Sequence, residues 1–420
     1  MQIQIEKTLD VEVVERQLAE LWKQTSGGRE MDDEAAVLRT RVANLLVFVS
    51  TNELLDEVHQ MLRELTGIHP SRVLMMVGAR AEPDRDIEMS LASIFQTDKR
   101  NGRERLCCES VTLRAQGNFA AELPSVALPL LIPDLTTFLW WRDVVQVSDK
   151  IFDTLLRATD RLVIDSAEFE DPENDLVETD KLFVHYSCEN VGISDLNWAR
   201  LTFWRELLAD FYDVPTYQPW LDKLDHVRID YVGPEHQPTT VAPQALLIAG
   251  WLASRLGWNL RSDQTPPEND ETLSFKFASN GRGSSPTADR GSSPTPGRPA
   301  VRLGTVTEGA RDREIKLELN RVERGERKPG RLVRVELRTN ADEPASFTVT
   351  RSADNLHLST EAKLGLEVHR GRVLPVRNRS AAQLLSREME ILCNDKIYQE
   401  ALALATTLID LSSSAHLGTE

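Results

Sequence analysis

The first part of the chain alternates short apolar runs with segments in which apolar residues return every three or four positions. Residues 41–50 and 71–78 are nearly unbroken apolar runs, typical of strands buried on both faces of a parallel sheet. Between them, residues 54–65 place leucine and valine at helical spacing. The same pattern predicts helices at 10–23, near 119–123 and at 150–158, and strands at 103–114 and 161–166. We therefore expect an α/β domain over residues 1–190 with an open, doubly wound, mostly parallel sheet.

A proline-rich apolar stretch, residues 124–142, stands at the centre of this domain. Its three prolines fix their own backbone angles and push each preceding residue away from the helical region, which predicts an extended connector. The residues that follow, up to Trp140 and Trp141, are β-branched and aromatic and predict a buried strand. Two interpretations stay open. The stretch delivers a charged pair, Arg142 and Asp143, to a binding edge, or the tryptophans are core and the prolines set the chain path.

The second half changes to an alternation with a period of two. Apolar residues take every second position near 227–232, 272–278, 315–319, 332–337, 347–349 and 356–358. Such short alternating strands predict an antiparallel sheet with one solvated face, and the two terminal helices at 381–392 and 395–408 would cover the other face. A further helix is predicted at 243–257, ending at Gly257. We expect an α+β domain over residues 191–420. A duplicated Arg-Gly-Ser-Ser-Pro-Thr segment at about 280–300 predicts a disordered insertion.

Two segments near the expected boundary differ sharply in polarity. Residues 168–180 are strongly acidic but lack the spacing of a calcium loop, so a solvated loop is expected. Residues 195–213 form the best amphipathic helix of the chain, with Trp198 and Arg205 on one face. Arg205 could bind an anion or serve in an ion pair, and an arginine with an apolar stem commonly packs.

The charge balance limits the classes of partner. A net charge of −17 argues against a general nucleic-acid binder and favours a partner with basic surface. No apolar run has the length of a membrane span or a signal peptide, so neither a membrane protein nor an exported one is expected, and a cytoplasmic protein is the default.

We find no constellation that predicts catalysis or a bound cofactor. The glycine-rich phosphate-binding motifs, the paired histidines of a helical metal site and the nucleophile elbow are all missing. A nucleotide site is therefore not expected, and no cofactor or metal is predicted. The four cysteines, Cys107, Cys108, Cys188 and Cys393, make neither a disulfide framework nor a zinc site and are interpreted as free structural thiols.

Two motifs carry a resemblance to a known family. The stretch Leu128-Pro-Leu-Leu-Ile-Pro-Asp-Leu-Thr-Thr-Phe-Leu-Trp-Trp-Arg142 resembles the signature of the OpcA family, the glucose-6-phosphate dehydrogenase assembly proteins of cyanobacteria and actinobacteria. A second segment, Asp195-Leu-Asn-Trp-Ala-Arg-Leu-Thr-Phe-Trp-Arg-Glu206, is similar to the other hallmark of that family. The βαβ start and the β-rich second half also fit, so the resemblance covers most of the chain.

The resemblance implies a non-enzymatic effector in the oxidative pentose phosphate pathway. Such a protein binds glucose-6-phosphate dehydrogenase, promotes its active oligomer and raises its affinity for glucose 6-phosphate. The partner surface, or its scaffold, is expected around Pro133, Asp134, Trp140, Trp141, Arg142, Trp198 and Arg205. Cyanobacterial members are also regarded as thioredoxin targets. Here Cys393 has no second cysteine after it, so a redox disulfide would need Cys107, Cys108 or Cys188.

Two other functions remain as alternatives. The protein could be a sugar-phosphate sensor or an enzyme with a pocket at the strand ends near Asp134, where Arg142 and Arg205 bind the phosphate. It could also be a structural scaffold for a different complex. Direct binding of glucose 6-phosphate to the isolated protein distinguishes the first, and unchanged dehydrogenase kinetics favour the second.

Overall fold

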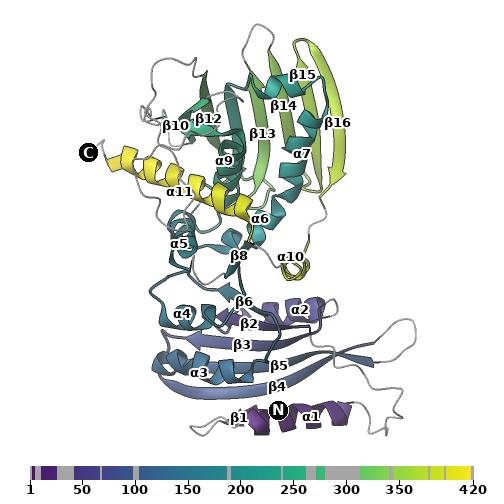
Figure 1. The fold of residues 1–420 in the computed structure, drawn as a ribbon, viewed down its shortest axis with the longest axis vertical. Coiled ribbons are helices and arrows are strands. Elements are labelled where there is room, and N and C mark those ends of the chain that lie inside the picture. Colours follow the sequence, from purple (N-terminus) through teal and green to yellow (C-terminus); the bar gives the residue numbers. More distant parts are fainter. Residues whose placement is uncertain are drawn as a thin grey trace. The chain divides into compact units, whose positions relative to one another are not determined.

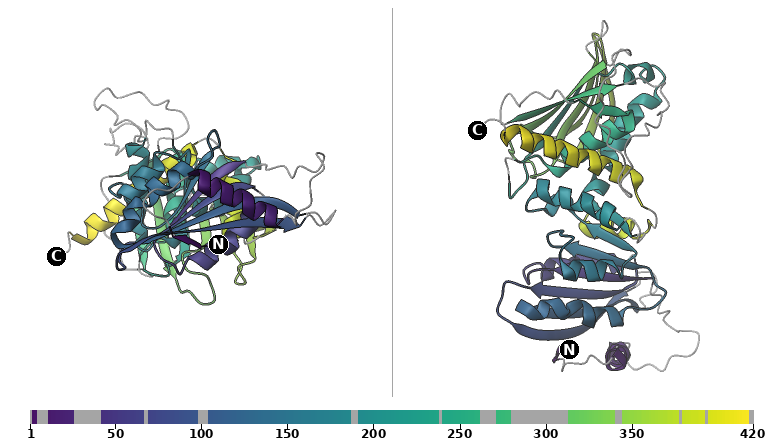
Figure 2. Two further views of the ribbon diagram at one scale, coloured as in Figure 1. Left: turned by 90° about the horizontal axis from the view of Figure 1, so that it is seen from below. Right: turned by 60° about the vertical axis from the view of Figure 1, so that its left-hand side comes forward.

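The computed structural model describes residues 2–4, 11–25, 42–66, 69–97, 104–186, 191–237, 240–261, 271–279, 313–339, 344–376, 379–391 and 394–417. The chain forms two compact units (Figures 1 and 2). The first unit contains residues 1–164, 188–196 and 379–394, and the second contains residues 165–187, 197–378 and 395–420. The chain therefore passes between the units several times, whereas the sequence predicted a single boundary at residue 190. The expected insertion at 280–300 lies outside the described residues.

The first unit is built on an eight-stranded sheet whose central strands are apolar on both faces. Its strands are β1 (Gln2–Gln4), β2 (Ala43–Val49), β3 (Ser71–Ala79), β4 (Arg85–Thr97), β5 (Glu104–Gln116), β6 (Thr137–Arg142), β7 (Arg161–Ile164) and β8 (Gly192–Asp195). Every residue of β2 and β3 is buried, as their unbroken apolar runs predict. The strand order is β1-β4-β5-β3-β2-β6-β7-β8. The mostly parallel, doubly wound sheet expected from the sequence is confirmed.

The order of the parallel strands defines where this sheet can bind a ligand. Strands β5-β3-β2-β6-β7-β8 are all parallel, and counted along the chain they stand in the order 3-2-1-4-5-6. This is the order of dinucleotide-binding sheets, in which ligands lie beyond the carboxyl ends of the strands where the order reverses. Here the reversal lies between β2 and β6. Beyond β5 the sheet continues with β4, which the sequence did not predict and which pairs antiparallel with β5, and with β1, which pairs antiparallel with β4.

The first unit has five α-helices among the described residues. They are α1 (Val11–Thr25), α2 (Leu55–Thr66), α3 (Leu123–Ala127), α4 (Lys150–Leu156) and α10 (Ala381–Glu388). Of these, α2, α3 and α4 connect parallel strands of the sheet. Helix α2 connects β2 to β3, whereas α3 and α4 contact each other and lie on the opposite face of the sheet (Figure 1). Helix α10 packs against α2, so the expectation that it covers the second sheet is wrong.

The proline-rich stretch before β6 is helical, which corrects the predicted extended connector. It consists of two 3₁₀ turns, Gly117–Glu122 and Leu128–Leu130, on either side of α3. Pro124 and Pro129 each occupy a first-turn position, where the missing N–H has no partner to lose and the fixed φ suits a helix. The helical path ends at Leu130, since Leu131 is already extended, and the strand predicted after the prolines is β6.

The second unit is a mixed, mainly antiparallel sheet with helices on its apolar face. Its strands are β9 (His226–Val232), β10 (Trp258–Leu260), β11 (Thr272–Ser279), β12 (Arg313–Val322), β13 (Leu332–Thr339), β14 (Ala345–Arg351), β15 (His357–Leu364) and β16 (Glu367–Pro375). They stand in the order β10-β11-β12-β9-β13-β14-β15-β16, and β12 pairs with β9 in parallel. The α+β class expected for this half is confirmed.

The helices of the second unit pack in two groups. They are α5 (Pro172–His185), α6 (Leu196–Arg200), α7 (Thr202–Asp213), α8 (Gln218–Leu221), α9 (Pro243–Leu256) and α11 (Lys396–Leu417). The single helix predicted at 195–213 is therefore two helices with a turn at Leu201. Aromatic side chains of α7 pack on Phe347 of β14, while α9 contacts β9 and packs against α11. Helix α9 ends at Gly257, whose left-handed conformation closes it as predicted.

The acidic segment expected as a solvated loop is helix α5, and this corrects the prediction. Asp171 caps the helix and Pro172 occupies its first turn. The acidic residues at this end are favourable because the helix dipole is positive there. One face is buried and includes Leu176, Leu182 and the carboxylate of Asp175, which is 2% exposed. Burial, followed by the nearby acidic groups, raises the pKa of Asp175 to about 6.

Replacing Asp175 with asparagine is expected to stabilise the protein at neutral pH. The folded-state pKa of about 6 exceeds the ordinary 3.8, so wild-type stability is lost as pH rises from below 3.8 through 6. The asparagine carbonyl keeps the bond from the Asp171 amide and removes the buried charge. We expect a gain of about 1–3 kcal/mol in unfolding free energy at pH 8 that shrinks towards pH 4. Urea unfolding across pH measures it, with exposed Glu206→Gln as the control.

Candidate functional site

The carboxyl edge of β2 and β6, where a dinucleotide would lie, is filled by aromatic side chains. The rings of Phe48 and Trp141 stack at 4.2 Å with an interplanar angle of 9°. Phe152 of α4 meets the edge of Trp141 at 4.9 Å. Phe48 also lies so close to Gly78 of β3 that a Cβ on that glycine would come within 2.9 Å of the ring. This edge is therefore a packed part of the core.

The turn that would hold a pyrophosphate carries the wrong groups for it. Residues 50–54, Ser-Thr-Asn-Glu-Leu, connect β2 to α2 without a glycine, so no backbone turn of the dinucleotide type forms. The first turn of α2 carries Asp56 and Glu57 at the helix end that would attract an anion. Glu57 instead meets Arg142, at 3.3 Å, and the Arg142 side chain is only 5% exposed. This turn thus lacks the glycines of the dinucleotide motif, its helix begins with carboxylates, and Arg142 is paired with Glu57.

Next to this edge, one arginine lies between two carboxylates. Arg80, directly after β3, approaches Asp149 at 2.6 Å and Asp143 at 3.8 Å, and its guanidinium lies 5.5 Å from the centre of the Phe48 ring. Asp149 also caps α4 by accepting the amide of Ile151 at 2.8 Å. Burial raises the pKa of Asp143, against the opposing effects of the Val144 amide and Arg80. The cation of Arg80 is therefore already neutralised within the protein.

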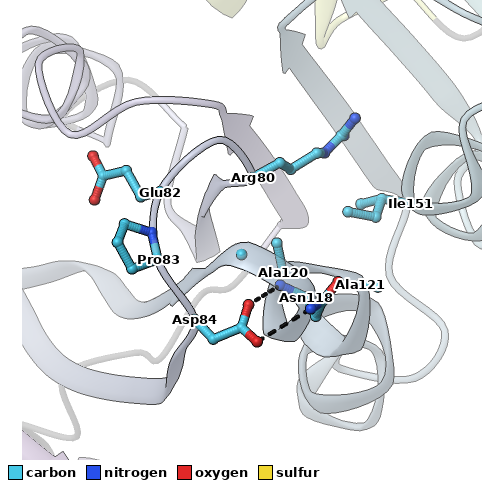
Figure 3. A pocket seen from close by; sticks show the side chains of 9 residues that line it. Arg80, Glu82, Pro83, Asp84, Asn118, Ala120, Ala121 and Ile151 are labelled. Atoms are coloured by element: carbon cyan, nitrogen blue, oxygen red, sulfur yellow. Dashed lines mark hydrogen bonds between the residues drawn. The ribbon is translucent and has the colours of Figure 1, made fainter.

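A pocket of about 390 Å³ opens beside Arg80 (Figure 3). Its wall contains Asp84, which accepts the backbone N–H of Asn118 at 2.8 Å and the side-chain amide at 3.1 Å, and these bonds lower the pKa of Asp84. Gly117 has φ +60, and a Cβ there would meet the Asp84 carboxylate at 2.1 Å, so only glycine fits this turn. The pocket thus has one cation, Arg80, and a rigid, partly acidic wall.

The structure separates residues that the sequence grouped around the central stretch. Pro133 and Asp134 are exposed and precede β6, whereas Arg142 ends it, so these residues lie at opposite edges of the sheet. Asp134 adopts a left-handed backbone with φ 63. Trp140 and Trp141 are buried between these ends. A pocket that includes both Asp134 and Arg142 is therefore not formed, because the length of the strand separates them.

Trp198 and Arg205, the predicted residues of the second unit, hold the start of α11. The Trp198 side chain donates from Nε1 to Asp395 at 2.8 Å, and Asp395 accepts the amides of Ile397 and Tyr398 in the first turn of that helix. The guanidinium of Arg205 lies 3.6 Å from the centre of the Trp198 ring. Trp198 is 4% exposed. Their contacts in the second unit are those of a scaffold.

Two of the four cysteines lie among the described residues. Cys107 and Cys108 are consecutive residues of β5, and Cys188 and Cys393 lie outside the described residues. A redox disulfide and a thioredoxin interaction therefore stay predictions. Across the described ranges, no group of three His, Cys, Asp or Glu side chains is arranged to hold a metal. In the same ranges, no helix has the length and apolarity to span a membrane.

Sequence reasoning missed the residues that fill the sheet edge. Phe48, Arg80 and Asp149 carry no motif, and their meeting depends on the strand order, which brings the ends of β2, β3 and β6 together. One signal was available: Asp149 stands directly before a predicted helix, where a carboxylate commonly caps. The partner of that cap could not be read from the chain.

The fold defines a two-domain protein whose first sheet has the strand order of dinucleotide-binding sheets, with the aromatic pair Phe48 and Trp141 packed near the carboxyl ends of β2 and β6. Family comparison then identifies the protein group. A family model described as "Glucose-6-phosphate dehydrogenase subunit N-terminal domain" matches residues 62–181, and the corresponding C-terminal domain model matches residues 191–402. The chain belongs to this OpcA family of glucose-6-phosphate dehydrogenase assembly proteins.

Curated relatives share this family. An OxPP cycle protein OpcA from Synechocystis sp. is 26% identical over 351 residues, which cover 83% of this chain and 66% of the relative. The OpcA protein of Nostoc punctiforme is 31% identical over 216 residues, which cover 51% of this chain and 44% of the relative. This chain thus spans two thirds or less of the length of these two relatives.

Solved structures resemble the chain weakly. A levoglucosan dehydrogenase in complex with NADH and L-sorbose has a TM-score of 0.42 at 9% identity and covers 89% of this chain and 97% of its own. An NAD binding oxidoreductase from Klebsiella pneumoniae has a TM-score of 0.43 at 10% identity and covers 90% of this chain and 98% of its own.

Proposed function

We propose that this protein is a non-catalytic effector that binds glucose-6-phosphate dehydrogenase, promotes its active oligomer and raises its affinity for glucose 6-phosphate. The family membership supports the choice of partner. The observation that supports the non-catalytic role lies at the carboxyl ends of β2 and β6: the turn after β2 has no glycine, Phe48 and Trp141 stack beside it, and Glu57 pairs with Arg142. A sheet of this order without the phosphate-binding turn suits a protein that acts by binding another protein.

The mechanism is differential binding between two states of the dehydrogenase. An effector that binds the active state more tightly shifts the population towards it by that difference in binding free energy. A tenfold gain in affinity for glucose 6-phosphate needs only about 1.4 kcal/mol of coupling. A moderate protein interface supplies a difference of this size, and no chemical step by the effector is required.

The test is the rate of the dehydrogenase from the same cell against glucose 6-phosphate concentration, with and without this protein. A fall in the apparent KM or a rise in rate, together with co-elution at larger mass, is the expected result. The measurement is repeated under oxidising and reducing conditions, since the cysteine predictions make the redox state a variable. Unchanged kinetics without co-elution under both conditions would contradict the proposal.

A sugar-phosphate sensor is the second candidate, and the pocket beside Arg80 is the place to examine it. The pocket lies at the carboxyl edge of β3, where ligands of such sheets gather. Against it, Asp149 and Asp143 already neutralise Arg80, and Asp84 and Glu82 add negative charge. Calorimetric titration of the isolated protein with glucose 6-phosphate distinguishes the candidates, and we expect no binding heat.

A further inference from the structure

One face of the second sheet carries charged side chains in place of apolar ones. The central strands β12, β9 and β13 alternate, and their polar positions form a set that we name the charged face: Lys316, Glu318, His226, Arg228, Asp230, Arg334, Glu336 and Arg338. The helices α7 and α9 pack on the opposite face, against Phe347 and the apolar residues of β9. The charged face is therefore the side of the sheet that these helices leave uncovered.

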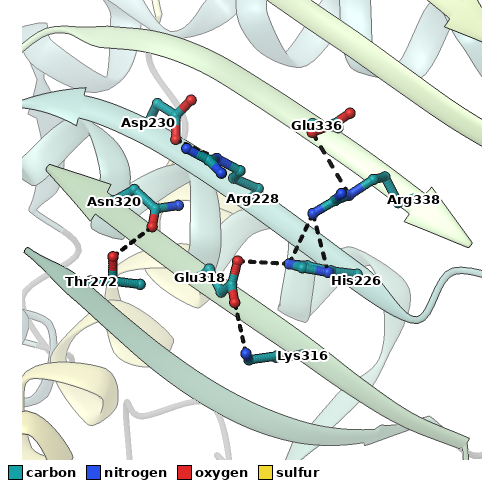
Figure 4. Close-up of polar contacts among 9 residues, drawn as sticks. All are labelled: His226, Arg228, Asp230, Thr272, Lys316, Glu318, Asn320, Glu336 and Arg338. Atoms are coloured by element: carbon teal, nitrogen blue, oxygen red, sulfur yellow. Dashed lines mark hydrogen bonds and ion pairs between the residues drawn. The ribbon is translucent and has the colours of Figure 1, made fainter. Parts of the chain in front are cut away.

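The charged side chains of this face form a network of ion pairs (Figure 4). Glu318 accepts from Lys316 at 2.7 Å and meets His226 at 2.9 Å. Arg228 donates to Asp230 at 2.8 Å, and Arg334 donates to Glu336 at 3.0 Å. Burial raises the pKa of Glu318, but Lys316 and His226 outweigh it and keep that pKa below its ordinary value. The Glu318 carboxylate therefore stays ionised, and the ion pairs hold these side chains in place.

The two signs of charge differ in how far they reach into solvent. The side chains of Lys316, Arg228, Arg334 and Arg338 are 34–46% exposed, while those of Glu318, Asp230 and Glu336 are 9–16% exposed. These three carboxylates thus lie deeper than the cations that they position. Glu314 of β12 lies on the same face and is exposed, and Lys276 of β11, opposite Lys316, adds a further cation there. In a chain with a net charge of −17, this makes the charged face a local region of outward positive charge.

We propose that the charged face is the docking surface for an acidic protein surface, and, resting on the proposed function, that this surface belongs to the dehydrogenase. Its fixed guanidinium groups suit bidentate bonds to carboxylates, and a rigid arginine loses little conformational entropy on binding. Charge complementarity of this kind speeds association and selects the partner.

A second copy of this chain fits the charged face poorly. A symmetric dimer places the same patch of both copies in contact, so the outward cations of one copy would face those of the other. Desolvating like charges in this way is costly, whereas carboxylates from a different protein neutralise them. The acidic partner is therefore the occupant that the charge arrangement favours.

The test compares two double variants with equal changes in net charge. Lys316→Gln/Arg334→Gln removes two outward cations of the charged face. The control, Arg324→Gln/Arg372→Gln, removes two exposed arginines elsewhere in the same unit, paired with Glu235 and with Asp210 of α7. We expect the dissociation constant for the dehydrogenase to rise about tenfold for the first variant and to change less than about twofold for the control. Binding is measured by interferometry between about 50 and 300 mM salt, and wild-type affinity should fall with salt more steeply than that of the first variant.

A bulky substitution tests the same surface without removing any of its charges. Ser346 of β14 stands between Arg338 and Lys363 in the strand register, so Ser346→Trp obstructs the charged face while leaving every ion pair in place. It should weaken binding like the double variant, and circular dichroism confirms that each variant is folded.

The outcomes separate the two proposals. If the wild-type protein does not bind the dehydrogenase, the proposed function fails and this inference fails with it. If the wild type binds and the charged-face variants bind equally well, only the docking surface is wrong. If sedimentation shows instead that these variants dissociate a dimer of this chain, the surface is an interface between copies and the acidic partner is excluded.

Discussion

Replacing Arg72 with methionine is expected to destabilise the first unit by about 3–5 kcal/mol. Arg72 of β3 is 2% exposed, and it donates to Glu109 of β5 at 2.7 Å and to Glu15 of α1. Burial alone would lower the pKa of Arg72, but the hydrogen bonds with Glu15 and Glu109 outweigh it and raise that pKa. Methionine fills the volume of the stem but removes the ion pair that Arg72 makes with the carboxylate of Glu109, which is also 2% exposed.

A second substitution isolates the cause of this loss. In Arg72→Met/Glu109→Gln the buried negative charge is gone, so we expect the double variant to recover a large part of the stability lost by Arg72→Met alone. A double-mutant cycle from urea unfolding gives the coupling between the two residues. Additive losses in that cycle would mean that the pair does not act as a unit, and the argument from the lost ion pair would fail.

Replacing Gly250 with alanine is expected to separate α9 from α11 and to lower the free energy of unfolding by about 3 kcal/mol. A Cβ at Gly250 would lie 2.0 Å from the carbonyl oxygen of Ala401 and 3.1 Å from the backbone nitrogen of Ala405. Both neighbours are helix backbone, so neither can rotate away, and the two helices must separate.

The sign of this result is decisive, because intrinsic preference predicts the opposite. In an exposed helix, glycine to alanine stabilises by about 1 kcal/mol. Thermal unfolding of Gly250→Ala, with Ser254→Ala on the same helix as the control, shows which effect dominates. A melting temperature above that of the wild type would mean that the helices do not approach as closely as described.

The sequence predicts those elements whose pattern is strong over many residues. The unbroken apolar runs became β2 and β3, and the helix ending at Gly257 was located to within a residue because its turns and its cap agree. The family was predicted from the resemblance of the two tryptophan-rich motifs, because composition and residue spacing alone do not identify it.

Where prediction failed, tertiary position decided between local options. Pro124 and Pro129 were interpreted as helix breakers, but a proline in the first turn of a short helix is compatible with it. The acidic segment became α5 because its few apolar residues share a face that the core buries, Leu176 and Leu182 among them. The filled edge at Phe48, Trp141 and Arg142 and the charged face both depend on strand order, which no local pattern contains.

The return of α10 to the first unit has a consequence for synthesis on the ribosome. Helix α10 completes the surface of α2, yet it follows all strands of the second sheet in the chain. The first unit therefore cannot finish folding when its own sheet has emerged, and α2 stays partly uncovered until the second sheet and α10 have been made. Chaperone binding during translation should accordingly favour nascent chains that end between β8 and α10.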